Sequence, residues 1–317
     1  MEGKPMKILI SGINGFAASH LAHYLVKEGH EVHGTVRVRS DLHKIKDILD
    51  RVTIHLVELS DSFSVGNVLN IVKPEEIYHL AAQSYVKSSW DSPIETYITN
   101  VIGTVNILEC VRKLDFSPSI LVTSTSEIYG TQEGKINEET VADPNTHYGI
   151  SKYAQDMIAR LYHRAYGMKV VVSRSFNVTG YGRAEVFVDS NFAKQVVEVE
   201  KGLRDVIRHG NLESSRDFTD IEDVVRGYVK IMRSKRWGEV FCLASEKPTK
   251  IQEVLDTLLK LAKVKVKTEI DPERMRPVDT PTMKGDATKA KEQLGWEKTI
   301  PLEKSLDNLL FYWRERL

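Results

Sequence analysis

The sequence lacks a net charge, because its 44 lysines and arginines equal its 44 aspartates and glutamates. A chain without a global electrostatic field is not expected to bind nucleic acid or an anionic membrane surface, so any anionic ligand must be met by local cations. Long apolar runs are also missing: the start MEGKPMKILISG contains no extended apolar signal region, and no run of about eighteen apolar residues occurs. We therefore expect a protein that is neither exported nor membrane-spanning.

Cysteine is scarce as well, with Cys110 and Cys242 as the two in the chain. They lie far apart and form no CxxC or Cys/His ligand pattern, so we expect both to be reduced, buried and structural, as in a cytoplasmic protein. None of the ten histidines forms an HExxH or another ligand spacing, which predicts no metal site. His79, at the end of an expected strand, is interpreted as a packing or surface residue.

The first half contains a regular alternation of short β-branched runs with amphipathic stretches. These predict strands at 7–11, 31–36, 52–57, 76–81, 119–124 and 169–175, and helices at 15–28, 41–50, 62–72, 94–114 and 148–166. Asp41 and Asp61 are expected to cap two of the helices. Strand–helix–strand crossovers imply a parallel sheet covered on both faces, so we predict an α/β protein with a Rossmann-type doubly wound parallel sheet.

The rhythm changes after residue 176, where a glycine-rich turn precedes a series of helices. They are expected near 189–201, from about 221, and at 250–262, 288–294 and 302–315. Residues 209–220, HGNLESSRDFTD, are expected to form a loop, and the proline-bearing segment 270–281 cannot be a regular helix. We predict a dinucleotide-binding domain at 1–175, which also receives part of 217–243, and a smaller C-terminal α/β substrate domain at 176–317 that packs on it.

Gly12, Gly15 and Ala18 follow the first expected strand at intervals of three, where the strand turns into a helix. Glycine permits the tight turn and lets backbone N–H groups approach a pyrophosphate, and the helix N-terminus adds a partial positive charge. A glycine pattern by itself marks any tight turn. Its position after the first strand of a βαβ series is what predicts a dinucleotide site.

The end of the second expected strand has no carboxylate where an NAD-binding protein would carry one for the adenosine ribose. The chain reads GTVRVRS there, and Arg37, Arg39 and Ser40 offer donors suited to a 2′-phosphate. This favours NADP over NAD. The alternative is that the two arginines belong to a solvated loop.

Four polar residues suited to acid–base chemistry lie close together in the sequence. Thr125 and Glu127 occupy the carboxyl end of an expected strand, where ligands of parallel sheets bind, and Tyr148 and Lys152 are four apart on one helix face. Lowering a tyrosine pKa from about 10 to near 7 requires about 4 kcal/mol, roughly what a cation about 4 Å away supplies. Lys152 would therefore activate Tyr148 as a base. The alternative is an ordinary Tyr–Lys pair on a helix surface.

Several short stretches resemble the extended short-chain dehydrogenase/reductase family, in its nucleotide-sugar branch: GINGFAA, HLAAQS, NVIGT, STSEIYG and YGISK. Within that branch VHGTVRVRS, GNLESSRDF, DPERMRP and GDATKAKEQLGW are most similar to GDP-mannose 4,6-dehydratases. The compact length and the stretches RDFTDIEDVVRGY and IPLEKSL also resemble the GDP-4-keto-6-deoxymannose reductases. The resemblance covers nearly the whole chain and implies an enzyme of the lyase class, a nucleotide-sugar 4,6-dehydratase.

The resemblance also implies roles for individual positions. Thr125, Glu127, Tyr148 and Lys152 match the catalytic set of the dehydratases. Cofactor contacts are implied at Gly12, Asn14, Gly15, Phe16, Arg37, Leu59, Leu80, Ala81, Ala82, Asn100, Tyr148 and Lys152, and substrate contacts at Ser84, Glu127, Asn177, Arg216 and Arg276. The two substrate arginines could instead be ordinary ion-pair partners. Two departures are present: FNVTG replaces the FNH of both relatives, and Glu58 stands where an Asp often contacts adenine.

For a 4,6-dehydratase the resemblance implies oxidation at C4, with Tyr148 taking the O4 proton and Thr125 bonding O4. Glu127 would then remove the acidified C5 proton as the C6 hydroxyl leaves as water. The alternatives are the 4-keto reductase, a dehydratase of another nucleotide sugar, a 4-epimerase, and a non-catalytic NADP-sensing protein on the same fold. The expected ligands are NADP and a GDP-sugar. The expected assembly is a homodimer or a dimer of dimers, paired through the outer faces of helices 94–114 and 148–166.

Overall fold

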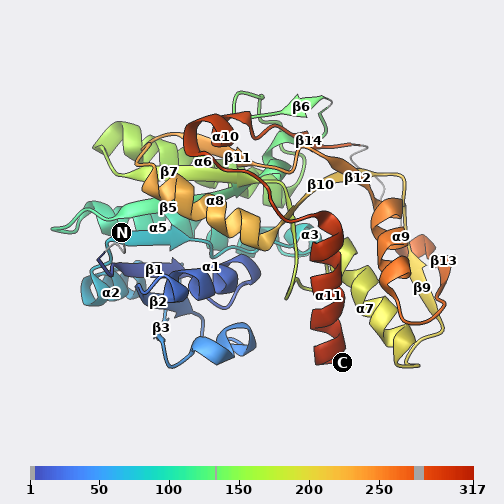
Figure 1. Cartoon of the computed structure of the whole chain (residues 1–317). Coiled ribbons are helices and arrows are strands. Elements are labelled where there is room, and N and C mark those ends of the chain that lie inside the picture. Colours follow the sequence, from blue (N-terminus) through green and yellow to red (C-terminus); the bar gives the residue numbers. More distant parts are fainter. Residues whose placement is uncertain (1–3, 133, 275–281) are drawn as a thin grey trace. The chain divides into compact units, whose positions relative to one another are not determined.

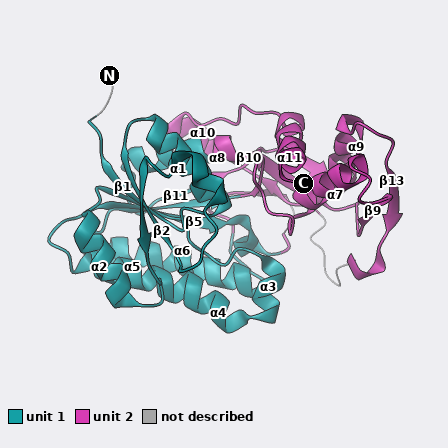
Figure 2. Ribbon diagram, turned by 90° about the horizontal axis from the view of Figure 1, so that it is seen from below, with its two compact units in different colours: residues 1–130, 141–175, 225–241 teal, residues 131–140, 176–224, 242–317 magenta. Residues whose placement is uncertain are grey.

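A computed structural model describes residues 4–132, 134–274 and 282–317 of the chain (Figure 1). The chain divides into two compact units, which are coloured separately in Figure 2. Unit 1 comprises the residues up to Gly130, Val141–Ser175 and Val225–Phe241, and unit 2 comprises Thr131–Thr140, Phe176–Val224 and Cys242–Leu317. Each unit is thus built from three separate chain segments, and the assignment of a cofactor domain and a substrate domain stays a prediction.

Within the described residues, the main sheet has seven strands in the order β11-β7-β5-β4-β1-β2-β3. The strands are β1 (Lys7–Ser11), β2 (Glu31–Val36), β3 (Val52–Leu56), β4 (Glu76–His79), β5 (Ser119–Thr125), β7 (Val170–Ser175) and β11 (Val240–Leu243). β1 pairs in parallel with both β2 and β4, so the winding of the chain reverses beside β1. Ligands of doubly wound sheets bind outside the carboxyl ends of the strands at this switch point. The predicted Rossmann-type α/β class is confirmed.

Helices cover both faces of the main sheet, with α2, α5 and α6 on one face and α1 and α8 on the other (Figure 2). Their bounds are α1 (Phe16–Lys27), η1 (His43–Ile48), α2 (Ser62–Val72), α3 (Val86–Asp91), α4 (Pro93–Tyr97), η2 (Ile98–Ile102), α5 (Gly103–Arg112), η3 (Ser126–Tyr129), α6 (His147–Tyr166) and α8 (Ile221–Arg233). The core against α2, α5 and α6 is one apolar cluster that includes Leu69, Leu108 and Val122. Burying each such side chain contributes about 1.5–3 kcal/mol, which holds the strand ends in fixed positions.

Two of the helices predicted for unit 1 were wrong in form. The expected helix 94–114 is three consecutive pieces, α4, the π-helical turn η2, and α5. The Thr104 hydroxyl donates to Asn100 O at 2.6 Å and competes for a carbonyl that a regular helix would use. The expected helix 41–50 is the 3-10 segment η1, which is preceded by Asp41 accepting from His43 N at 2.9 Å. The cap predicted at Asp61 is confirmed, since it accepts from Phe63 N at 3.0 Å.

Among its described residues, unit 2 holds three small sheets, in the orders β12-β10-β8, β13-β9 and β14-β6. Its elements are β6 (Lys135–Ile136), β8 (Asn177–Thr179), α7 (Val188–Glu200), β9 (Val206–His209), β10 (Ser215–Asp220), β12 (Pro248–Lys250), α9 (Ile251–Leu261), β13 (Lys267–Ile270), η4 (Pro272–Arg274), β14 (Lys284–Gly285), α10 (Thr288–Leu294) and α11 (Leu302–Arg316). Helices α7, α9 and α11 pack together around an apolar core that includes Phe192, Leu255 and Leu309. Residues 275–281 of the proline-bearing segment lie outside the described residues.

The strand β10 lies within residues 209–220, so the prediction of a loop over that whole segment was wrong. β10 pairs in parallel with β8 and antiparallel with β12. The charged residues of β10 made it hard to predict from the sequence, because a buried carboxylate is not expected in a strand. Asp217 is fully buried, yet its carboxylate accepts from Ser245 N at 2.6 Å and from Gly285 N at 3.1 Å. Both partners are distant in sequence, so local patterns do not indicate them.

The two cysteines differ in burial. Cys242 is buried as predicted, but Cys110 is partly exposed, and its Sγ donates to Ser62 O at 3.3 Å. Across the described ranges, no helix combines the length and the apolar character needed to cross a membrane. In the same ranges, no three His, Cys, Asp or Glu side chains are arranged to hold a metal ion.

Candidate active site

The turn after β1 carries the glycines predicted to form a phosphate site. Gly12 has a φ of +68°, and a Cβ at this position would lie 3.0 Å from Ala81 Cα, so the position requires glycine. Gly15 N donates to Gly12 O at 2.8 Å, and Gly15 is the N-cap residue of α1. Because glycine has no side chain, no side-chain cap covers the N-terminus of α1. The N-terminus of α1, which has no side-chain cap, and the glycine backbone before it therefore suit an anion.

The charges around this turn favour the same kind of ligand. The first turn of α1 contains no acidic residue, so the positive end of its dipole is not opposed there. Arg37 directly follows β2; its side chain is 69% exposed and forms a loose ion pair with Glu95 Oε1 at 3.8 Å. Asn14 Nδ2 donates to Asp41 O at 3.2 Å, which ties the glycine turn to the loop that contains Arg37. The structure thus brings the predicted phosphate-binding residues onto two neighbouring loops.

A buried hydrogen-bond chain begins at the end of β1. Ser11 Oγ lies 2.8 Å from His79 Nδ1 and accepts from the N–H groups of Leu80 and Ala81, each at 3.0 Å. The bonds hold the loop after β4 against the glycine turn. Leu80 and Ala81, both predicted cofactor residues, are therefore held by their backbone, which leaves their small or apolar side chains to shape the surface.

Both ring nitrogens of His79 take part in this series of hydrogen bonds. Its Nε2 lies 2.9 Å from Thr104 Oγ1, and the Thr104 hydroxyl donates its own hydrogen bond to Asn100 O. His79 must then donate from Nε2 and accept from Ser11 at Nδ1, which fixes its tautomer through the hydrogen-bond network. Burial, together with the positive charge of Lys152, lowers the pKa of His79 to about 3. It is a neutral structural residue, as the packing interpretation predicts.

Asn100 continues the series of hydrogen bonds to helix α6. The residue is fully buried, and its Oδ1 accepts from Gln83 N at 2.8 Å. Its Nδ2 donates to Gln83 O at 3.1 Å and to Ser151 Oγ at 2.9 Å. Since both amide protons and the carbonyl oxygen bond protein groups, the geometry favours a positioning role for Asn100 over direct contact with a cofactor. Asn100 connects the loop after β4 to the helix that carries Tyr148 and Lys152.

The four predicted catalytic residues all belong to unit 1 and come from β5, η3 and α6. Thr125 ends β5, and its Oγ1 accepts from Glu127 N at 3.3 Å, so it caps the short turn that carries Glu127. Tyr148 and Lys152 lie in the first two turns of α6. Thr125, Glu127 and Tyr148 are partly exposed, whereas Lys152 is buried. Three of the four side chains are therefore partly accessible to solvent, whereas the fourth is enclosed by protein.

Two glycines allow η3 to approach α6 and the loop that precedes it. A Cβ at Gly149 would lie 2.7 Å from Glu127 O, so the helix backbone passes directly against the turn. Gly130, which follows η3, has a φ of +62°, and a Cβ there would overlap Asp143 O. A side chain at Gly149 would force η3 and α6 apart, and one at Gly130 would displace the loop that precedes α6. Both glycines belong to the stretches STSEIYG and YGISK, but only the structure shows that they permit these close contacts.

Lys152 is held below the site. Its Nζ donates to Thr123 O at 2.6 Å and to Gln155 Oε1 at 2.5 Å. Burial lowers the pKa of Lys152 to about 7, and the negative charge of Asp156 opposes this shift. The side chain is thus a cation whose protonation changes near neutral pH, a property typical of functional sites.

The other predicted residues of unit 1 line the loops after β3 and β4. Leu59 is buried, with its carbonyl accepting from Asn106 Nδ2 at 2.8 Å. Ala82 is partly buried and Ser84 is exposed. Glu58, the departure at the expected adenine position, has Oε1 accepting from Ser60 N at 3.3 Å. These loops follow the strands next to the switch point, where ligands of such sheets bind.

Two of the predicted substrate residues lie in unit 2. Asn177 begins β8 and is aligned with Phe218 of β10, two residues after Arg216. Arg216 Nη1 donates to Ser215 O at 2.9 Å, and the side chains of Asn177 and Arg216 are both partly exposed. The two are thus on adjacent strands. Arg276 lies outside the described residues.

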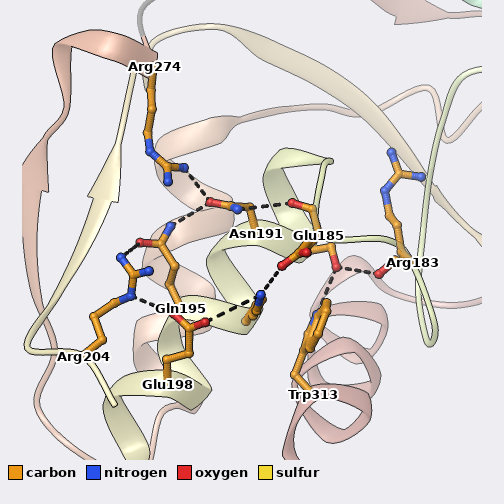
Figure 3. Close-up of polar contacts among 10 residues, drawn as sticks. Arg183, Glu185, Asn191, Gln195, Glu198, Arg204, Arg274 and Trp313 are labelled. Carbon is orange, nitrogen blue, oxygen red and sulfur yellow. Dashed lines mark hydrogen bonds and ion pairs between the residues drawn. The ribbon is translucent and has the colours of Figure 1, made fainter. Parts of the chain in front are cut away.

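A polar network on α7 was not predicted from the sequence (Figure 3). Asn191 Oδ1 accepts from Arg274 Nη1 at 2.8 Å and from Gln195 Nε2 at 2.7 Å. Gln195 Oε1 in turn accepts from Arg204 Nη1 at 2.9 Å. The spacing of four between Asn191 and Gln195 is a local signal, but Arg274 is 83 residues from its partner. The network holds the guanidinium groups of Arg274 and Arg204 in place.

Comparison with known proteins identifies the family. The structure of RMD from Pseudomonas aeruginosa complexed with NADPH is similar over 98% of this chain and 100% of that chain, with a TM-score of 0.85 and 26% identity. This likeness, with the fold and the Tyr–Lys helix, places the chain among the short-chain dehydrogenase/reductases. A profile of the family described as GDP-mannose 4,6 dehydratase matches residues 9–309, and the chain belongs to this family.

Two curated relatives fit the same family. GDP-mannose 4,6 dehydratase 1 of Arabidopsis thaliana is 31% identical over 320 residues, which cover 95% of this chain and 88% of that protein. GDP-6-deoxy-D-mannose reductase of Pseudomonas aeruginosa is 28% identical, with 98% of each chain covered. The resemblance read from the sequence is confirmed, and so is the class of enzyme, a lyase family related to the short-chain dehydrogenase/reductases.

Proposed function

We propose that the chain is an NADP-dependent GDP-mannose 4,6-dehydratase, which converts GDP-mannose to GDP-4-keto-6-deoxymannose. The observation that carries the proposal is the packing of the Glu127 turn directly against the helix of Tyr148 and Lys152, with Gly149 at the contact. A reductase needs a tyrosine, a lysine and a hydroxyl residue but performs no elimination, so a glutamate on the turn that packs against their helix favours the dehydratase. Family membership and the name of the Arabidopsis relative support the same reaction.

NADP fits the loops that follow β1 and β2. The close approach of Gly12 to Ala81 and the uncapped start of α1 suit a pyrophosphate. Arg37, at a strand end without a carboxylate, suits a 2′-phosphate, and the NADPH in the RMD structure supports this choice. Bound there, NADP would supply oxidation at C4 and return the hydride to C6.

Tyr148 would act as the first base. It would take the O4 proton while Thr125 donates a hydrogen bond to O4. Lys152, held on Thr123 O beneath the site, would supply the positive charge that lowers the pKa of Tyr148. The ketone formed at C4 makes the C5 proton acidic, which prepares the elimination.

Glu127 would carry out the elimination. It would abstract the C5 proton and deliver it to the departing C6 hydroxyl, so that one water leaves. A proton from solvent would then return to C5 as the hydride reaches C6. Atoms and electrons balance with the loss of one water and no net oxidation.

The nucleotide would be held by side chains that offer donors to phosphates. In unit 2 we assign this role to Asn177, Arg216 and Arg276, and in unit 1 we assign a sugar contact to Ser84. On a protein with no net charge, a nucleoside diphosphate needs such local cations. The partial exposure of Arg216 is consistent with this role.

The second candidate is a reductase of the 4-keto-6-deoxy sugar. The observation that favours it is the Pseudomonas aeruginosa reductase, which matches this chain over 98% of both lengths. That reaction would consume NADPH stoichiometrically, whereas the dehydratase regenerates its cofactor in each turn.

Mass spectrometry of GDP-mannose incubated with the protein and a catalytic amount of NADP+ separates the two. The dehydratase removes one water from the sugar nucleotide without net cofactor turnover, and Glu127→Gln abolishes that loss. An unchanged GDP-mannose, together with NADPH oxidation when the 4-keto-6-deoxy sugar is supplied, would reject the dehydratase in favour of the reductase.

We also propose a homodimer formed through the outer faces of the α4–η2 segment and α6. Ile94, Ile98 and Ile102 are 73%, 41% and 45% exposed, and on α6 Met157 and Leu161 are 47% and 48% exposed. Apolar rows of this kind on adjacent helices are typical of an association surface. Sedimentation analysis of Met157→Glu, which places a charge in the row, should show a monomer where the unmodified protein shows a dimer.

A further inference from the structure

Helix α6 places a third ionisable residue in line with the two predicted catalytic ones. Tyr148, Lys152 and Asp156 are spaced four apart, so they follow one another along a single helix face. Tyr148 is partly exposed, whereas the side chain of Asp156 is 0% exposed. A carboxylate buried to this degree requires partners, because burying an unpaired charge is very costly.

Asp156 has two arginine partners. Its Oδ2 accepts from Arg174 Nε at 2.8 Å and its Oδ1 accepts from Arg160 Nε at 2.8 Å. Arg174 lies on β7 with 4% of its side chain exposed, whereas Arg160 is 27% exposed. Arg174 also donates from Nη1 to the Tyr129 hydroxyl at 2.8 Å, and its Cζ lies 5.4 Å from the centre of the fully buried Tyr129 ring.

Tyr129, Arg174 and Asp156 form a cluster that links the elements of the candidate site. Tyr129 ends η3, two residues after Glu127, and Asp156 lies one helical turn after Lys152. A single guanidinium on β7 therefore bridges the turn that carries the proposed acid and the helix that carries the proposed base. The link complements the backbone contact at Gly149, which lies at the other end of the same interface.

A purely stabilising role does not account for a cluster of this composition. Desolvation of a buried ion pair offsets much of its attraction, and apolar side chains of similar volume often stabilise a fold as well or better. A planar guanidinium does something that apolar side chains cannot, since it fixes the directions of two hydrogen-bond partners at once. The carboxylate also acts on its neighbour along the helix: burial lowers the pKa of Lys152, and the charge of Asp156 opposes that shift.

We propose that the Tyr129–Arg174–Asp156 cluster consists of positioning residues: it holds the Glu127 turn in register with Tyr148 and supplies the countercharge of Lys152. The chemical part of this inference rests on the proposed function. The part that concerns the charge of Lys152 needs no substrate, so it is open to a separate test. Each member acts through another residue and is buried beneath the predicted catalytic ones.

Tyr129→Phe tests the positioning role, because it removes one hydroxyl and keeps the ring in the core. Misplacement of a catalytic group by about 1 Å costs about 100-fold, so we expect kcat for water loss from GDP-mannose to fall about 10- to 100-fold with KM nearly unchanged. The matched control is Tyr162→Phe, on α6, which removes a phenol that donates to Glu109 Oε1 at 2.6 Å away from the site. The control should keep its kcat. A wild-type kcat in Tyr129→Phe would overturn the positioning role.

Asp156→Asn tests the countercharge without substrate. NMR titration of isotope-labelled lysine, with Lys152 assigned from Lys152→Met, should show a midpoint near the value of about 7 set by burial, and Asp156→Asn should lower it. An unchanged midpoint would overturn the countercharge role. If the unmodified protein removes no water from GDP-mannose, the proposed function fails, and the titration alone decides the inference. If Asp156→Asn does not fold, the kcat of Tyr129→Phe decides it.

Discussion

The two units bury charge in different ways. In unit 1 a group of buried charged residues gathers near the carboxyl ends of β5 and β7, and it includes Lys152, Asp156 and Arg174. In unit 2 the buried carboxylates are dispersed, and each accepts hydrogen bonds from backbone N–H groups, hydroxyls or one arginine. Asp223, for example, accepts from Thr299 N at 3.1 Å, Thr299 Oγ1 at 2.9 Å and Ile300 N at 2.9 Å.

Buried charge thus serves two purposes in this protein, one chemical and one structural. Asp223 has its lone pairs used by fixed donors, so its charge serves to hold a distant loop. Lys152 keeps a charge that changes near neutral pH, beside partly exposed groups that could react with a ligand. Substitutions should therefore cost activity in the first group and stability in the second.

Lys152→Met should have the largest effect on activity. Without the cation, the pKa of Tyr148 would return toward the usual value of about 10, which leaves about 1,000-fold less phenolate at pH 7. We expect the rate of water loss from GDP-mannose to fall by about that factor, measured by single-turnover kinetics. Stability in the absence of ligand should not fall, because the buried cation is costly. A stability loss as large as the activity loss would contradict a catalytic role for this buried charge.

Lys152→Met should also change how the free energy of unfolding depends on pH. The pKa of Lys152 is lowered from 10.5 to about 7 in the folded protein, so between these values the unfolded chain binds a proton that the folded protein does not. The free energy of unfolding contributed by this group therefore rises with pH across that window and is constant below it. Urea unfolding at several pH values should show a smaller rise in Lys152→Met. Identical pH profiles for the two proteins would contradict the buried, titrating lysine.

Asp223→Ala should have the largest effect on stability. It removes the acceptor of several hydrogen bonds to Thr299 and Ile300, each worth about 1.5–3 kcal/mol when an ion takes part. We expect the free energy of unfolding to fall by about 3 kcal/mol in urea titrations, with activity per folded molecule retained. Asp256→Ala on α9 is the control, since Asp256 is exposed and accepts from Gln252, and it should change stability by less than about 0.5 kcal/mol.

Gly149→Ala should reduce activity about 100-fold, because its Cβ would lie 2.7 Å from Glu127 O and would displace the acid. Gly167→Ala is the matched control at the other end of α6. Gly167 has a φ of +65° and open space around a Cβ, so alanine there should cost about 1 kcal/mol of stability and leave kcat unchanged. Steady-state kinetics and thermal unfolding of both variants would show whether the two effects separate. Equal kcat values in the two variants would reject the close approach as a determinant of activity.

Arg37→Ala should have the smallest effect and should act on the cofactor alone. The loss of charge-assisted hydrogen bonds to a 2′-phosphate should weaken NADP+ binding about 10- to 100-fold. NAD+ is the internal control, since its affinity should change little. Fluorescence titration with both cofactors measures the ratio, and a parallel loss of both would remove Arg37 from the specificity argument.

Sequence patterns predicted six of the seven strands described for the main sheet, because these strands are short β-branched runs, but they predicted neither β11 nor the strand order. The glycine turn, Arg37 and the Tyr148–Lys152 pair could be identified for the same reason, since each depends on neighbours in sequence. The π-helical turn η2, in which Gly103 N donates to Ile98 O, could not be predicted, because a change from α- to π-helical bonding leaves no periodic signal in the sequence. β10 was missed because the partners of Asp217 are distant in sequence.

The site itself was predicted as a set of residues, but not as a geometry. Nothing local indicates that Gly149 faces Glu127 O, or that Asn100 uses its amide on Gln83 and Ser151. The Tyr129–Arg174–Asp156 cluster likewise draws its members from three elements. Such contacts follow from the packing of α6 and η3 against β5 and β7, which periodicity does not encode.

The proposed dehydration is tested most directly by the reaction of GDP-mannose in heavy water with the protein and a catalytic amount of NADP+. We expect a sugar nucleotide that has lost one water and carries one solvent-derived deuterium at C5, and we expect no such product from Glu127→Gln. A product that keeps its oxygen at C6, or that forms equally well in Glu127→Gln, would contradict the proposed dehydration.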